Sequence, residues 1–121
     1  SFISNNMQQN FDIAALERDR EICIKQQELG QSVARLMTNR DFKKIILEGY
    51  FKDEAVRLVH LKQDPAVQSA DSQRNIIRDM DSIGVLAAYL SMAISSGERA
   101  ANTIEAIDAE LIEIRAEALN D

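Results

Sequence analysis

Apolar residues in the C-terminal half of the chain recur at alternating steps of four and three residues. The first row is Ile76, Met80, Ile83, Ala87, Leu90 and Ile94, and the second is Ala100, Ile104, Ile107, Leu111, Ile114 and Ala118. These steps place each row along one face of an α-helix, at the a and d positions of a heptad repeat. The two rows are out of register by one residue across 95–97. Residues 70–118 therefore predict either one long helix, kinked near 95–97, or two helices hinged at Gly97.

Both rows need apolar partners, because a heptad face left in water loses its main source of stability. We predict that the residues from Ile76 to Ile94 in the first row, and from Ile104 to Ile114 in the second, form an interface with partner helices. Gly84, Gly97 and Ala101 carry little or no side chain and would let another backbone approach closely. The chain must therefore fold back on itself or form an oligomer.

A first helix is predicted over residues 11–38, with a less regular apolar pattern. Its apolar row repeats every seven residues, while the companion positions Asp19 and Gln26 are polar. The row consists of Ala15, Ile22, Leu29 and Leu36, with Val33 beside it near the end. The preceding residues 1–10 are polar and are expected to form a frayed tail.

The segment 39–65 predicts a short helical joint between the two long elements. Asn39 is a suitable N-cap, and Asp64-Pro65 stops a helix because proline disfavours helical geometry in the residue before it. Gly49 suggests a break at which it adopts the left-handed conformation and Tyr50 closes over Ile45. The alternative is one bent helix that continues through Gly49. The residues assigned to this joint are Phe42, Gly49, Tyr50, Phe51 and Pro65.

Composition agrees with an all-α fold. The 121 residues include only one proline and four glycines, which leaves little turn chemistry for β-hairpins. Aromatic residues are few, at 5%. We therefore predict a single helical domain over 1–121, built as a helical hairpin or bundle with long heptad-patterned helices and a short helix-turn-helix joint in the middle.

Charge is distributed unevenly along the chain. Residues 1–70 hold ten acids and ten bases, whereas residues 71–121 hold ten acids and four bases, which accounts for the net charge of −6. A nucleic-acid-binding protein is expected to carry a basic face, so nucleic acid is not an expected partner. The acidic half instead keeps the surface soluble or faces a basic protein.

The sequence contains no arrangement of residues typical of catalysis. His60 is the only histidine, and Cys23 lies between Ile22 and Ile24 in a helical pattern typical of a small core residue. A nucleophilic triad needs a histidine within reach of Ser or Cys, and a bundle metal site needs Glu-x-x-His pairs, whereas residue 57 is Arg. We expect no enzyme, metal or cofactor. A membrane span is not expected, because no apolar run approaches about 18 residues. A signal peptide is not expected either, because residues 1–10 lack a charged n-region and an apolar h-region.

The stretch DFKKIILEGYFKDEAVRLVHLKQDP at 41–65 is the most distinctive part of the sequence. Over residues 38–100 the chain resembles small helical proteins encoded among the head and tail structural genes of tailed bacteriophages. The resemblance is strongest at Phe42, Gly49-Tyr50-Phe51, Glu54-Ala55, Arg57-Leu58 and Asp64-Pro65. It implies a non-enzymatic virion component at the head, portal and neck or the capsid interior. No functional residues are carried over from that group.

This resemblance implies self-association or contact with other virion proteins, and a location in the virion and in the host cytoplasm during assembly. Two alternatives stay open. One is a phage scaffolding protein, although scaffolds that hold a shell often use a basic tail and this C-terminus is acidic. The other is a bacterial coiled-coil adaptor or regulatory protein.

Overall fold

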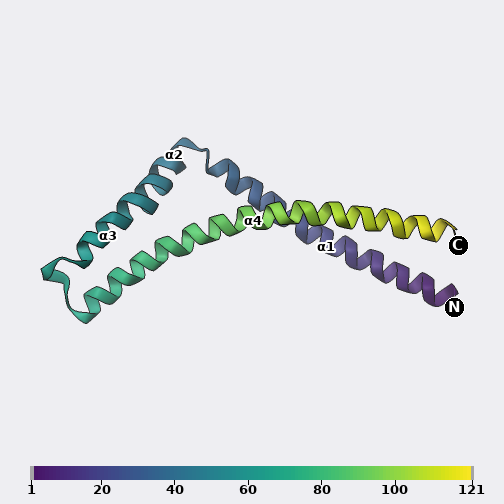
Figure 1. Cartoon of the computed structure of the whole chain (residues 1–121), viewed down its shortest axis with the longest axis horizontal. Helices are drawn as coiled ribbons and strands as arrows, with labels where there is room; N and C mark the ends of the chain where they lie inside the picture. Colours follow the sequence, from purple (N-terminus) through teal and green to yellow (C-terminus); the bar gives the residue numbers. More distant parts are fainter. Residues whose placement is uncertain (1, 121) are drawn as a thin grey trace. The chain divides into compact units, whose positions relative to one another are not determined.

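The structure, a computed structural model, describes residues 2–120, and helices make up nearly all of them, with short turns at 37–39, 63–64 and 68–69. In order, the elements are α1 (Phe2–Leu36), α2 (Arg40–Phe42), the π-helical η1 (Lys43–Glu54), α3 (Ala55–Lys62), the 3₁₀ turn η2 (Pro65–Val67) and α4 (Ala70–Asn120) (Figure 1). Residues 2–120 contain no strand. The predicted all-α class is confirmed, and α4 is one continuous helix rather than two.

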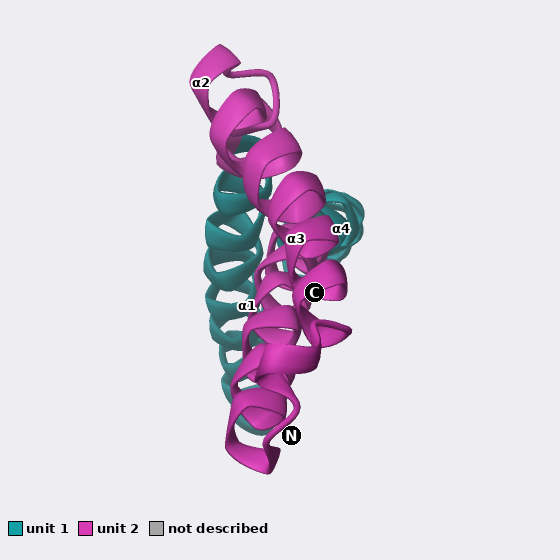
Figure 2. Ribbon diagram, turned by 90° about the vertical axis from the view of Figure 1, so that its left-hand side faces the viewer, with its two compact units in different colours: residues 1–31, 93–121 teal, residues 32–92 magenta. Residues whose placement is uncertain are grey.

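Two compact units divide the chain. In its described part, unit 1 pairs residues 2–31 of α1 with residues 93–120 of α4, and unit 2 contains residues 32–92 (Figure 2). The sequence predicted a single domain over the same residues. Each long helix contributes one part of its length to each unit.

In unit 1 the backbones of α1 and α4 approach closely at Gly30 and Gly97. A Cβ atom built on Gly30 would lie 2.9 Å from the carbonyl oxygen of Ala93 and 3.1 Å from the Cα of Gly97. A Cβ atom on Gly97 would lie 3.1 Å from the carbonyl oxygen of Gln26. Both glycines have ordinary negative φ, so space and not backbone conformation requires them. Gly97 thus fits the predicted close approach.

Gly84 does not fit that prediction, because a Cβ atom added there would meet nothing within 4 Å. The contact at Gly97 is instead completed by Gly30, which the sequence pattern did not single out. Buried Ala93 and Ala100 lie on the same face of α4 as Gly97, so the side chains on that face are small.

The buried face of α1 differs from the predicted one. The residues of α1 that are buried or half-buried in unit 1 include a row that we call the packed row: Ile13, Leu16, Arg20, Cys23, Gln27 and Gly30. The predicted row of Ala15, Ile22, Leu29 and Leu36 is here called the outer row. Its last three residues are exposed and Ala15 is half-buried, while Val33, predicted to lie beside the row, is buried in unit 2. Ile22 is 56% exposed and Leu29 45% exposed. The prediction was wrong because the contact at Gly30 and the pairing of Arg20 turn a different face of α1 toward α4.

The N-terminal residues also differ from expectation. The helix α1 begins at Phe2, so the segment expected to be a frayed tail forms regular helical turns with mostly exposed side chains. No glycine or proline interrupts residues 2–29, and Gln8 donates a hydrogen bond to Asp12 one turn later, at 3.1 Å. Ser1 lies outside the described residues.

In unit 2 the predicted break at Gly49 is absent, and helical turns run without interruption from Arg40 to Lys62. Asn39 caps them as predicted, with its side chain accepting the backbone N–H of Phe42 at 2.9 Å. No described residue has positive φ, so Gly49 is not left-handed. The i→i+5 bonding of η1 takes more residues per turn than an α-helix, which changes the phase of the apolar positions without ending the helix. The alternative of a continuous helix was therefore the correct interpretation.

The core of unit 2 forms where this helical segment lies against α4. Leu58 is only 1% exposed and clusters with buried Ile76 and Ile83. Around them pack Tyr50, Phe51, Ala55, Leu61, Val67 and Met80. The Tyr50 and Phe51 rings lie 6.0 Å apart in a tilted arrangement. Tyr50 therefore packs into this core and does not close over Ile45, which is exposed.

Glutamine side chains close the turn between α3 and α4. The Asp64 side chain accepts the backbone N–H of Ala66 at 2.9 Å, and Pro65 occupies the first position of η2, as the sequence predicted. The side-chain amides of Gln68 and Gln73 each donate to the carbonyl oxygen of Lys62 at 3.0 Å. Carbonyls that the end of α3 leaves without helical partners are thus satisfied by side chains.

We expect Gly30→Ala to lower the free energy of unfolding by about 1–2 kcal/mol, because the overpacking penalty exceeds the gain in helix propensity. The matched control is Gly84→Ala, which fills open space in a helix and is expected to raise it by up to about 1 kcal/mol. Urea denaturation followed by circular dichroism measures both. Equal effects of the two substitutions would contradict the close contact.

We expect Leu58→Ala to lower the free energy of unfolding by about 2–5 kcal/mol, because it leaves a cavity among the side chains around Ile76 and Ile83. Val56→Ala, at an exposed position of the same helix, is the control and should cost under about 1 kcal/mol. Thermal and urea melts of both variants test this. A Leu58→Ala variant as stable as the wild type would show that this core is not formed.

Candidate helix-pairing interface

The residues predicted to form a partner-helix interface lie on faces of α4 that are occupied within the chain. Five are buried (Ile76, Ile83, Leu90, Ile107 and Leu111) and five are half-buried (Met80, Ala87, Ile94, Ile104 and Ile114). The first row belongs to unit 2 up to Leu90, and the second row belongs to unit 1. Most of this predicted interface therefore serves internal packing, and contact with another chain at these residues stays a prediction.

The predicted joint residues occupy different environments. Tyr50 and Phe51 enter the core of unit 2, and Phe42 and Gly49 are half-buried. Pro65 is exposed in the turn η2.

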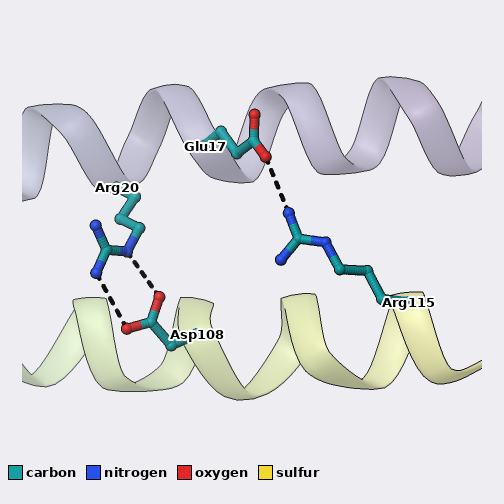
Figure 3. Close-up of polar contacts among 4 residues, drawn as sticks. All are labelled: Glu17, Arg20, Asp108 and Arg115. Carbon is teal, nitrogen blue, oxygen red and sulfur yellow. Dashed lines mark hydrogen bonds and ion pairs between the residues drawn. The ribbon is translucent and has the colours of Figure 1, made fainter.

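Polar residues join α1 to α4 in unit 1 (Figure 3). Arg20 donates from Nε to Asp108 Oδ1 at 2.7 Å and from Nη2 to Asp108 Oδ2 at 3.3 Å. Further along, Arg115 Nη2 donates to Glu17 Oε1 at 3.0 Å. A two-pronged contact between a guanidinium and a carboxylate fixes geometry more strongly than a single contact. The Arg20–Asp108 pair therefore sets which residues of the two helices lie opposite each other.

The ion pair alters the acidity of its own members. The hydrogen bond from Arg20, together with its positive charge, holds the pKa of Asp108 below its usual value. In return, the hydrogen bond and the charge of Asp108 raise the pKa of Arg20. Both side chains are partly open to water, with exposed fractions of 38% and 44%, so the pair determines register more than it adds stability.

An open groove runs along the same side of unit 1, beside these ion pairs. Its volume is about 740 Å³, and we call it the charged groove. Its lining comprises Ala14, Glu17, Arg18, Arg20, Glu21, Ile24, Asp108, Leu111 and Arg115. Three acids and three arginines therefore surround an apolar floor, and the lining is neutral on a chain whose net charge is −6.

A second, smaller groove of unit 1 is lined mainly by polar residues. Its lining is Gln26, Ser96, Arg99, Ala100 and Thr103. Arg99 donates to the hydroxyl of Ser96 at 3.2 Å, and Thr103 donates to the carbonyl of Arg99. These polar groups already have partners within α4, so this groove offers fewer free contacts than the charged groove.

Gly30, Arg20 and Asp108 are the interface residues that sequence reasoning missed. A search for apolar periodicity passes over a glycine and two charged residues, although all three lie where the helices meet. The spacing from Arg20 to Gly30 and from Gly97 to Asp108 is nearly equal, at ten and eleven residues. In two antiparallel helices, residues that meet at two points must be separated by similar distances along both helices. This matched spacing is the sequence signal that could have indicated the contacts.

Within residues 2–120 no group of three or more His, Cys, Asp or Glu side chains is placed to hold a metal ion. His60 is exposed near the end of α3, and Cys23 is half-buried in the packed row. None of the helices among these residues is long and apolar enough to cross a membrane.

Asp108→Asn is expected to lower the melting temperature at pH 7 by a few degrees or less. Because the folded-state pKa of Asp108 is depressed, the ionised carboxylate stabilises the fold above its unfolded pKa of about 3.9. This contribution is lost as the pH falls through the folded-state pKa. The difference between wild type and variant should therefore shrink below about pH 4.

Thermal melts from pH 7 to pH 2 measure this difference. The control is Glu113→Gln, which changes an exposed acid of α4 for which the structure gives no ion pair. A difference between wild type and Asp108→Asn that stays constant across the acidic range would refute the role of the Arg20 contact.

Comparison with known proteins identifies no family or function for this chain. No protein-family model, curated protein or solved structure matches the chain. Its function must therefore be inferred from the faces that its helices present.

Proposed function

We propose that this chain is a non-enzymatic structural protein that assembles through helix–helix contacts. The observation that carries the proposal is a set of large apolar side chains that stay exposed in helical rows, away from the faces packed within the chain. In α1 these are Ile22, Leu29 and Leu36 of the outer row and, before it, Met7 and Phe11. Soluble monomers seldom expose such extended apolar surface, whereas interaction sites do.

The same feature occurs in unit 2. Val85, Tyr89 and Met92 are exposed at steps of four and three residues on α4. They are offset from the row of Ile83 and Leu90, which is buried on another face of the same helix. Exposed residues at these steps are the anchors by which one helix binds along another. Several faces would then be available for contact with neighbouring subunits.

We further propose that the assembly is the virion of a tailed bacteriophage, with the chain at the head, the portal and neck or the capsid interior. The resemblance of residues 38–100 to small helical phage structural proteins supports this. The partners are then further copies of the chain or other virion proteins. The location would be the virion, and the host cytoplasm during assembly.

Mass spectrometry of purified particles, from a phage that encodes this chain, tests the proposal. A virion component is expected at a fixed stoichiometry in mature particles. A scaffolding protein would occur in precursor shells only, and a bacterial adaptor would be absent from both. The chain's absence from mature particles would therefore overturn the virion role.

A further inference from the structure

The charged groove of unit 1 carries two side chains whose charges are not paired within the described chain. Arg18 and Glu21 both line it, and the structure gives neither of them an ion pair. By contrast, Arg20, Glu17, Asp108 and Arg115 in the same lining are already paired across the two helices. One cation and one anion, a single helical turn apart, are therefore available to an incoming molecule.

Exposed apolar side chains follow the same edge of α4 as two of the groove's lining residues, Asp108 and Arg115. Asp108, Ile112, Arg115 and Leu119 follow one another at steps of four, three and four residues, so they lie along one edge of the helix. Ile112 is 69% exposed and Leu119 is 87% exposed. Together with the half-buried Ile24 on the floor, they provide apolar surface that a docked helix would cover.

We infer that the charged groove binds a second copy of this chain, groove to groove, through two-fold symmetry. In such a contact residue i of one copy meets residue j of the other, and the reverse holds as well. Arg18 of each copy then faces Glu21 of the other, so both free charges are satisfied at once. A partner of a single charge sign would satisfy only one of the two.

The electrostatics of the groove support a second copy in another way. Two chains of net charge −6 repel each other over most of their surfaces. The groove is lined by three acids and three arginines, so this face is neutral and can approach its own copy without net repulsion. Pairing would join two helices from each copy into a four-helix arrangement, with apolar residues inside and charged residues at the rim.

The inference rests on the proposed function of assembly through helices, and it names the partner. Charge reversal tests it directly by sedimentation velocity. The wild-type chain is expected to dimerise at micromolar concentration. Arg18→Glu places two acids opposite each other in both symmetric contacts, and Glu21→Arg places two bases there. Each single variant should weaken self-association by about tenfold or more.

An equimolar mixture of the Arg18→Glu chain and the Glu21→Arg chain is the decisive sample. In the mixed dimer acids again face bases, so association should return to within about threefold of the wild type. The double variant R18E/E21R should also pair with itself. If the mixture and the double variant both stay monomeric, the reciprocal contact is wrong.

Two further variants place the contact on this face. Ile112→Asp puts a charge at the exposed edge of the groove and should abolish dimerisation while leaving the helical circular dichroism unchanged. Arg99→Glu in the polar groove makes the same charge change as Arg18→Glu and should leave dimerisation unchanged. A stronger effect of Arg99→Glu than of Arg18→Glu would overturn the assignment.

The outcomes separate this inference from the proposed function. A wild-type chain that stays monomeric at about 100 μM, far above a micromolar Kd, overturns the pairing even if the chain occurs in purified particles. A dimer that responds as described, but is absent from particles, upholds the pairing and overturns the virion role.

Discussion

The close contact of Gly30 with Gly97 is the constraint on which unit 1 depends. With so little space between the two backbones, a side chain on either residue would collide with the opposite helix. The neighbouring positions of α4 are accordingly small, with buried Ala93 and Ala100 on either side of Gly97. Close approach increases dispersion contacts between the helices and fixes where they cross. The pair Arg20–Asp108, about ten residues away on each helix, then keeps the same residues opposite one another.

This constraint has a consequence for the exposed surface of α1. The packed row contains Arg20, Gln27 and Gly30, and so it is less apolar than the outer row. Hydrophobic burial alone would have favoured Ile22 and Leu29, because apolar area removed from water is the main source of helix-packing energy. The backbone contact turns these residues outward instead. The exposed apolar surface is thus a direct result of how the chain packs on itself, and it supports a role in assembly.

Both long helices, α1 and α4, carry apolar residues on more than one face. Within each unit only one face of each helix is buried, and the other apolar residues remain exposed. In unit 2 the aromatic residues of the joint cover Ile76 and Ile83, while Val85 and Tyr89 remain open on α4. In unit 1 Ile112 and Leu119 remain exposed on α4, each four residues after a lining residue of the charged groove. A protein whose helices are apolar on several faces is suited to contacts with several neighbours.

The sequence by itself determined the all-α class and the caps at Asn39 and Asp64, because these depend on local periodicity and local hydrogen bonds. It predicted helix over 70–118 but left open whether this is one helix or two. Only the tertiary structure decided which face of α1 is buried and whether Gly49 interrupts its helix. The first choice depends on Gly30 and Gly97, and on Arg20 and Asp108, meeting across more than sixty residues of sequence. The second depends on Tyr50 and Phe51 packing near Leu58, which favours a continuous helix that brings all three to one core.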